Sequence, residues 1–214
     1  MPRTLLCFGD SNTHGTPPIV NRGVYARFDA ATRWPCVAQR ALGPDWVLVE
    51  EGLPGRTAQF EDVIMGAHMD GRAGLKIALC SHGPLDVLTI MLGTNDTKTR
   101  FGATPAQVTA GIAGLLDIAM SDEMQTRHGG FKVLLICPPP VLEQGPIKYE
   151  FTGGRAVSLA LPPLFAALAA ARGVGFFDAG GVIGVSPVDG IHYEAATHLV
   201  LGAAVAGVVA TIAS

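Results

Sequence analysis

Three residues that could together carry out acyl transfer stand at opposite ends of the chain. Ser11 follows a short apolar run, whereas Asp189 and His192 lie three residues apart in the carboxyl-terminal part. A serine hydroxyl is a poor nucleophile until an imidazole accepts its proton, and a buried carboxylate fixes the tautomer of that imidazole. One turn of chain can hold Asp189 against Nδ1 of His192 and leave Nε2 for Ser11. The three residues therefore predict a nucleophilic serine with its base and its orienting acid.

Acyl transfer also needs hydrogen-bond donors for the oxyanion of the tetrahedral intermediate, each worth roughly 3 kcal/mol. The candidates are the N–H of Ser11, the N–H of Gly55 in a turn-rich segment, and the side-chain amide of Asn95. No G-x-S-x-G sequence is present, so the nucleophile is not expected on the elbow of an α/β-hydrolase. No spacing typical of metal ligands occurs, and neither a metal nor a cofactor is predicted.

Short apolar runs alternate with helical patterns along the chain, which is typical of repeated βα units. Strands are predicted at 5–8, 46–50, 86–92, 132–137 and 174–177, and helices at 32–42, 70–82, 104–119, 155–172 and 194–212. This order predicts an α/β fold, a three-layer α/β/α sandwich with a flavodoxin-like five-stranded parallel sheet, in a single domain over residues 1–214. The carboxyl ends of parallel strands meet at one edge, where open sheets bind ligands. We therefore expect the predicted site residues to converge there.

Local signals define several of these elements. Asp70 is a typical helix cap, and Thr104 with Gln107 forms a capping-box pattern with Pro105 at the first helical position. The helix predicted at 155–172 is expected to kink or split at its two adjacent prolines.

Three further features bear on the site. His14 lies one turn past the serine without an acid nearby and is expected to form part of a pocket wall. Glu194 and His198 are four residues apart on a predicted helix and are expected to form a surface salt bridge rather than a metal site. The loop at 141–154 is expected to cover the site, because long loops in compact domains are often functional.

Composition limits the partners of the chain. Charged residues make up 15% of the 214 residues, against a usual share of about 25%, so part of the surface is expected to be buried between copies in a homo-oligomer. The net charge of −3 and the lack of basic runs disfavour nucleic acid and anionic membranes. Four widely spaced cysteines and an amino terminus without a leader pattern predict a cytoplasmic protein with reduced thiols. The apolar tail at 199–213 is expected to be a packed helix, too short to cross a bilayer.

Four sequence blocks, in order, resemble the SGNH hydrolases, also called GDSL-type esterases. They are Phe8-Gly9-Asp10-Ser11, Gly52-Leu53-Pro54-Gly55-Arg56-Thr57, Gly93-Thr94-Asn95-Asp96 and Asp189-Gly190-Ile191-His192. The resemblance implies that Ser11 is the nucleophile, that Gly55 and Asn95 are oxyanion donors, and that Asp189 and His192 complete a triad. Each block alone is a weak signal, but four in this order and spacing are specific.

The second and third blocks, with Lys98 shortly after the third, look most like the bacterial arylesterase/acyltransferase branch. Members of that branch cleave short-chain esters, several pass the acyl group to alcohols or peroxide, and some assemble as octamers. One departure is Asn12, which stands where the family name implies leucine. Asn12, Lys98 and Ile191 are expected to contact the substrate, and Asn12 to alter acyl or alcohol preference.

The sequence thus predicts a serine esterase, an arylesterase acting through an acyl-enzyme on Ser11, with possible acyl transfer to alcohols or peroxide. A carbohydrate-ester deacetylase or a lysophospholipase with the same triad stays an alternative, although an aromatic share of 7% favours a small ester over a sugar. An alternative from another class is a flavodoxin-like module that holds FMN in the loop after the first strand.

Overall fold

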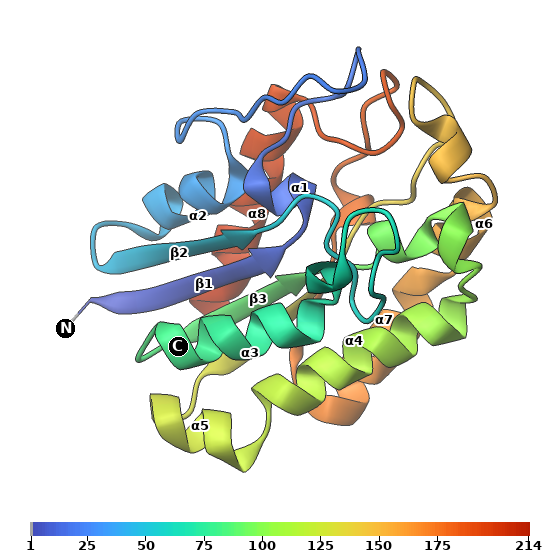
Figure 1. The fold of residues 1–214 in the computed structure, drawn as a ribbon. Coiled ribbons are helices and arrows are strands. Elements are labelled where there is room, and N and C mark those ends of the chain that lie inside the picture. The colour runs from blue at the N-terminus through green and yellow to red at the C-terminus, as the bar shows by residue number, and fades with distance from the viewer. Residues whose placement is uncertain (1) are drawn as a thin grey trace.

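The computed structural model describes residues 2–214 and shows five parallel strands between two layers of helices (Figure 1). The strands run in the order β2-β1-β3-β4-β5 across the sheet. Their bounds are Arg3–Gly9 for β1, Trp46–Gly52 for β2, Val87–Met91 for β3, Lys132–Cys137 for β4 and Gly175–Asp178 for β5. The predicted fold class and all five predicted strands are confirmed.

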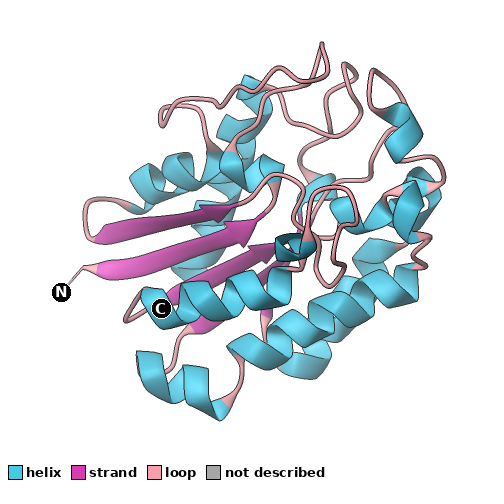
Figure 2. Ribbon diagram, in the orientation of Figure 1, coloured by secondary structure: helices cyan, strands magenta, loops and turns pink. Residues whose placement is uncertain are grey.

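Helices cover both faces of the sheet (Figures 1 and 2). One layer contains α2 and α8, and the opposite layer contains α3, α4 and α7. The α-helical bounds are Ser11–His14 for α1, Trp34–Leu42 for α2, Gly71–Ser81 for α3, Pro105–Ala119 for α4, Asp122–His128 for α5, Gly154–Leu159 for α6, Leu161–Arg172 for α7 and Ala195–Ile212 for α8. Short 3₁₀ turns are η1 at Ala67–Met69, η2 at Asn95–Thr97, η3 at Thr99–Phe101, η4 at Lys148–Glu150 and η5 at Ala179–Gly181.

Strand β1 lies between two hydrophobic cores and contributes side chains to both. Leu6 and Phe8 belong to the core under α3, α4 and α7, whereas Leu5 and Cys7 belong to the core under α2 and α8. All four side chains are fully buried. Because side chains alternate between the two faces of a strand, an uninterrupted apolar run is what a strand covered on both faces requires.

The helix boundaries follow the capping signals. Thr104 Oγ1 accepts the Gln107 N–H at 3.3 Å, and Gln107 Oε1 accepts the Thr104 N–H at 2.9 Å, which completes the predicted capping box of α4. Asp70 caps α3 as predicted. The predicted 155–172 helix is split at Ala160, ahead of its prolines, because Pro162 fits within the first turn of α7.

The predicted surface pair of Glu194 and His198 is wrong. His198 is fully buried, and its Nδ1 accepts the Trp34 N–H at 3.3 Å, at the start of α2. Burial lowers the pKa of His198 to about 4, so the ring is neutral at physiological pH. Glu194 instead accepts a hydrogen bond from the Ser186 hydroxyl at 2.5 Å. The inner face of α8 therefore uses a neutral histidine to bind the amino end of α2.

Helix α8 confirms the helix predicted at 194–212, because it runs from Ala195 to Ile212. Its 18 residues are long and apolar enough to cross a membrane by length and composition, a test that core helices of soluble proteins also pass. Leu201, Val205 and Val209 are fully buried in the core that α8 shares with α2 and the sheet. This is the packing that the sequence predicted for the tail.

Candidate active site

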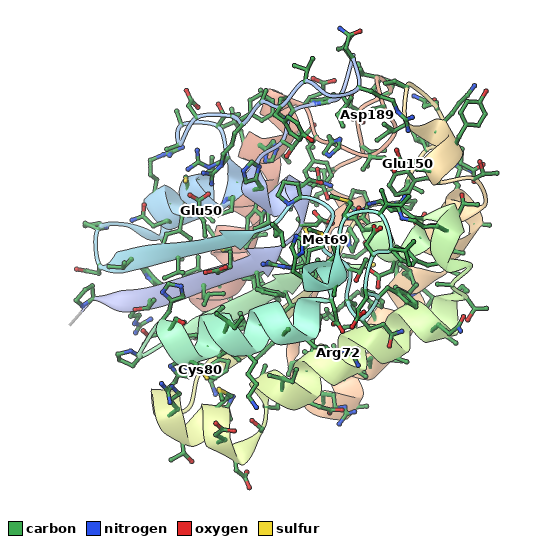
Figure 3. All side chains as sticks on the ribbon, viewed as in Figure 1. Glu50, Met69, Arg72, Cys80, Glu150 and Asp189 are labelled. Carbon is green, nitrogen blue, oxygen red and sulfur yellow. The ribbon has the colours of Figure 1, made fainter. Side chains whose placement is uncertain are left out.

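The predicted site residues come together beyond the carboxyl edge of the sheet. Strand β1 ends at Gly9, and Ser11 is the first residue of α1, the short helix that follows. Asp189 and His192 lie on the loop between η5 and α8. Figure 2 shows the long connecting loops gathered past the arrowheads of the strands, and Figure 3 places Asp189 among them.

Ser11, His192 and Asp189 form a continuous hydrogen-bonded chain. His192 Nε2 lies 3.0 Å from Ser11 Oγ, and His192 Nδ1 lies 2.6 Å from Asp189 Oδ2. A carboxylate can only accept, so Nδ1 carries the ring proton and Nε2 is free to accept the serine proton. Ser11 is 6% exposed, His192 5% and Asp189 0%, so Asp189 is shielded from water and the other two have little exposed surface. The arrangement can deprotonate the serine hydroxyl.

Asp189 is held in its ionised form by several donors. Its Oδ1 accepts the backbone N–H groups of Ile191 at 3.0 Å and His192 at 2.9 Å, and its Oδ2 also accepts the N–H of Ile19 at 2.7 Å. Burial alone would raise the pKa of Asp189, but the hydrogen bond and charge of His192 and the backbone N–H groups of Ile19 and His192 hold the pKa below its usual value. An ionised Asp189 can therefore stabilise an imidazolium during the reaction.

The three candidate oxyanion donors all border one cavity, but they differ in whether they already have a hydrogen-bond acceptor. Within residues 2–214, the backbone N–H groups of Ser11 and Gly55 have no hydrogen-bond acceptor, so both are available to a ligand. Asn95 Nδ2 donates to Asp10 Oδ2 at 3.3 Å and to the Arg56 carbonyl at 3.1 Å. The Asn95 amide must therefore share or exchange one of these bonds, and the 3.3 Å contact is the weaker of the two.

Asp10 is a site residue that the sequence reasoning did not assign. It is 1% exposed, caps α1 by accepting the Asn12 N–H at 2.9 Å, and contacts Asn95 with its other oxygen. Burial raises the pKa of Asp10 to about 6, although the Asn12 N–H and nearby cations lower it. The signal that could have found it is the preference of aspartate for the residue before a helix. Asp10 thus connects the helix of the nucleophile with an oxyanion donor.

Arg56, in the second sequence block, is a second unassigned residue. It is 5% exposed, donates to the Gly9 carbonyl at 2.9 Å and also to the Glu51 carbonyl, and lies 4.1 Å from the ring centroid of Phe8. It therefore joins the ends of β1 and β2 beneath the loop that carries Gly55.

A cavity of about 550 Å³ opens above Ser11 and His192. Much of its wall is apolar and comes from loops on several sides, through Ile19, Val24, Met65, Ile147, Phe151 and Ile191. The 141–154 loop contributes to this wall, as expected, and so does His14. The contribution of residues 16–27 was not predicted, because nothing in their sequence indicates that they fold back over the site.

Two of the three predicted substrate contacts line the cavity, and the third does not. Lys98 and Ile191 line the cavity, whereas Asn12 does not. Asn12 is 1% exposed, and its Nδ2 donates to the Ile191 carbonyl at 3.2 Å. The expectation of a direct substrate contact for Asn12 is therefore corrected. The polar side chain ties α1 to the loop of the acid and base, a bond that a leucine could not make.

No group of three or more His, Cys, Asp or Glu side chains in the described part of the chain is arranged to hold a metal ion.

Comparisons with known proteins point to ester hydrolysis. Residues 7–200 match the model of the GDSL-like lipase/acylhydrolase family. The fold is similar to the aryl esterase of M. smegmatis, with a TM-score of 0.92, 37% identity, and coverage of 98% of this chain and 99% of that one. It is equally similar to a carbohydrate acetylesterase from Sinorhizobium meliloti, with a TM-score of 0.93, 37% identity and the same coverage. A search of curated proteins finds no match.

Proposed function

The chain belongs to the GDSL-like lipase/acylhydrolase family and is a carboxylic ester hydrolase. Within this class we propose that it is an arylesterase acting on short-chain esters through Ser11. The observation that carries the proposal is the hydrogen-bonded chain from Ser11 through His192 to Asp189 on the wall of an apolar cavity.

In the proposed mechanism, His192 Nε2 accepts the hydroxyl proton as Ser11 Oγ attacks the ester carbonyl carbon. The carbonyl oxygen becomes an oxyanion held by the N–H groups of Ser11 and Gly55 and by the Asn95 amide. The C–O bond then breaks, and the leaving phenol or alcohol takes the proton from His192. A water molecule, deprotonated by His192, attacks the acyl-enzyme, and the carboxylic acid leaves as Oγ recovers its proton.

The cavity supports a small, largely apolar substrate. About 550 Å³ is enough for an aryl or short alkyl ester, and its apolar walls favour such groups over sugar hydroxyls. The same walls favour an organic alcohol over water as the second nucleophile, so we also propose acyl transfer to alcohols. Adding benzyl alcohol to a phenyl acetate assay should yield benzyl acetate beside acetate, and acetate alone would contradict the transfer.

A second candidate is the deacetylation of carbohydrates, which the similarity to an acetylesterase from S. meliloti favours. It uses the same residues and differs only in the leaving alcohol. Comparing kcat/KM for phenyl acetate and for an acetylated monosaccharide distinguishes the two, and a higher value for the sugar ester would favour the second candidate. The FMN-binding alternative explains neither the His192–Asp189 pair nor the family match.

The decisive experiment is covalent labelling with a fluorophosphonate, followed by peptide mass spectrometry and an aryl acetate assay. We expect the adduct on Ser11 and a loss of at least about 10³-fold in kcat for Ser11→Ala. Ser81→Ala is a matched control, because Ser81 is exposed at the end of α3 and lies outside the cavity lining. An adduct on another residue, or unchanged turnover by Ser11→Ala, would refute the proposal.

A further inference from the structure

Lys98 occupies an unusual position for a lysine, because it is buried in the wall of the catalytic cavity. Its side chain lines the cavity together with Ser11, and the residue is only 5% exposed. Its backbone N–H donates to the Asn95 carbonyl at 3.1 Å, so Lys98 closes the same 3₁₀ turn, η2, that begins with the oxyanion amide. The side chains nearest to its ammonium, Met65 and Phe151, also line the cavity, so the ammonium lies at the cavity wall.

The Lys98 ammonium has almost no polar partner within the protein. Its contacts are Met65 Sδ at 3.8 Å and the ring of Phe151, whose centroid lies 6.0 Å away. Among residues 2–214, no carboxylate oxygen lies within 4.0 Å of its Nζ. An ammonium has three N–H donors, and a thioether is a weak acceptor. The donors of Lys98 are thus largely free for a ligand.

The other two cations of the cavity wall, Arg22 and Arg27, each have a carboxylate within ion-pair distance. Arg22 lies 2.5 Å from a Glu150 carboxylate oxygen, and Arg27 lies 3.4 Å from Glu50. Glu150, labelled in Figure 3, is the acidic side chain in the described cavity lining, and it pairs with Arg22 and, at 3.4 Å, with Arg100. In the part of the chain that the structure describes, Lys98 is the lysine or arginine of the lining without a carboxylate partner.

A buried, unpaired ammonium is costly, because it loses hydration without gaining a counter-charge. Burial lowers the pKa of Lys98, and the charge of Arg100 lowers it further, whereas Asp62, Glu150 and Asp10 raise it from a distance. A bound anion would supply the missing partner. One ammonium matches a monoanion such as a carboxylate, whereas a phosphate dianion would call for further free cations, which the described lining does not offer.

We propose that Lys98 binds a carboxylate group of the substrate, so that the enzyme acts preferentially on esters that carry a negative charge beside the scissile bond. This inference rests on the proposed ester hydrolysis at Ser11 and narrows its substrate class. The carboxylate belongs either to the acyl group, as in a half-ester of a dicarboxylic acid, or to the leaving group, as in an acylated hydroxybenzoate.

Two pairs of substrates test the proposal and distinguish the two sources of the carboxylate. The acyl pair is monophenyl glutarate against neutral phenyl valerate, and the leaving-group pair is 4-acetoxybenzoate against neutral 4-acetoxybenzamide. The readout is the ratio of kcat/KM for the anionic member to that for the neutral member. We expect this ratio to exceed one in one pair and to fall at least about tenfold in Lys98→Met, which keeps the stem and removes the charge.

Two further variants serve as controls. Lys98→Arg keeps a cation and should retain part of the preference. Lys76→Met removes an exposed lysine of α3 outside the cavity lining and should leave every ratio unchanged. Thermal unfolding and fluorophosphonate labelling of Ser11 show whether Lys98→Met is folded with an intact nucleophile.

The outcomes separate this proposal from the proposed function. Two results would overturn the role of Lys98 while leaving the esterase intact. One is a wild-type preference for the neutral ester in both pairs, and the other is an anionic-to-neutral ratio of kcat/KM in folded Lys98→Met that equals the wild-type ratio. A wild-type enzyme that hydrolyses neither phenyl acetate nor any of the four esters would instead refute ester hydrolysis itself.

Discussion

The pKa values of three buried carboxyl groups around this site shift in opposite directions. Asp189 receives several hydrogen bonds and stays ionised, whereas Asp10 and Asp96 lie where burial dominates and raises the pKa values of their carboxyls to about 6 and about 7. Asp96, directly after the oxyanion amide of Asn95, is fully buried and accepts the Ala58 N–H with both oxygens, at 2.9 and 3.0 Å. The charge state of these groups is therefore coupled to folding.

Replacing Asp96 with asparagine should change how stability depends on pH. A folded-state pKa of about 7, above an ordinary value of 3.8, means that the folded protein binds more protons between these values, so wild-type stability falls as pH rises through this window. Each pKa unit of difference is worth about 1.4 kcal/mol. Urea unfolding from pH 4.5 to 8.5 should show Asp96→Asn gaining stability relative to wild type up to about pH 7 and then levelling off. A difference independent of pH would contradict the prediction.

Asn95→Ala should reduce kcat for an aryl acetate by about 10²- to 10³-fold with little change in KM, because an oxyanion donor acts mainly on the transition state. Steady-state kinetics on the folded variant measures the effect. Asn21→Ala provides the control, since Asn21 is exposed and does not line the cavity. A raised KM with unchanged kcat would instead assign Asn95 to ground-state binding.

At the scale of elements, caps and apolar runs determine the frame without contacting the site. Thr104→Ala removes the hydroxyl of the α4 capping box and should lower the free energy of unfolding by about 1 kcal/mol, with kcat/KM unchanged. Chemical denaturation gives the first value and an aryl acetate assay the second. Thr109→Ala, inside the same helix, should have a smaller effect, because its hydroxyl donates to the Pro105 carbonyl within the helix and caps neither end. Equal losses in the two variants would argue against the cap.

The parts of the fold that could be predicted are those with local causes. The five strands follow from short apolar runs, and α3 and α4 follow from the caps at Asp70 and Thr104. Helix α5 was missed because its seven residues are too few to show a period, although Ser121 and Gly129 bound it with an ordinary cap and left-handed end. The contact between Ser11 and His192, which are far apart in the sequence, could be predicted from the four family blocks, because no local pattern links the two residues.

The parts that could not be predicted depend on tertiary contacts. Whether Asn12 faces the cavity or the Ile191 carbonyl is decided by the packing of α1 against a distant loop. The burial of His198 likewise depends on α2, which supplies the Trp34 N–H. A periodic pattern predicts which face of a helix or strand is buried, but it does not predict which distant segment packs against that face.

At the scale of the whole molecule, the low charge content and the apolar surface near the cavity favour self-association. Tyr25, which lines the cavity, is 97% exposed, and Val63 and Ile64 are 91% and 74% exposed. We expect a homo-oligomer whose mass by light scattering is insensitive to moderate salt, since an apolar interface is not screened. Replacing Val63 and Ile64 with serine should favour smaller species without unfolding the chain. A monomer at all concentrations would contradict the expectation.

The backbone bond from Ile19 to Asp189 has a practical consequence for changing what this enzyme accepts. Ile19 lines the cavity, yet its backbone N–H also donates to Asp189, which holds His192. Selectivity and turnover are therefore not separate design variables along this segment. A proline at position 19 would remove both the N–H that Asp189 accepts and a side chain of the cavity wall, so it should lower turnover and alter preference together.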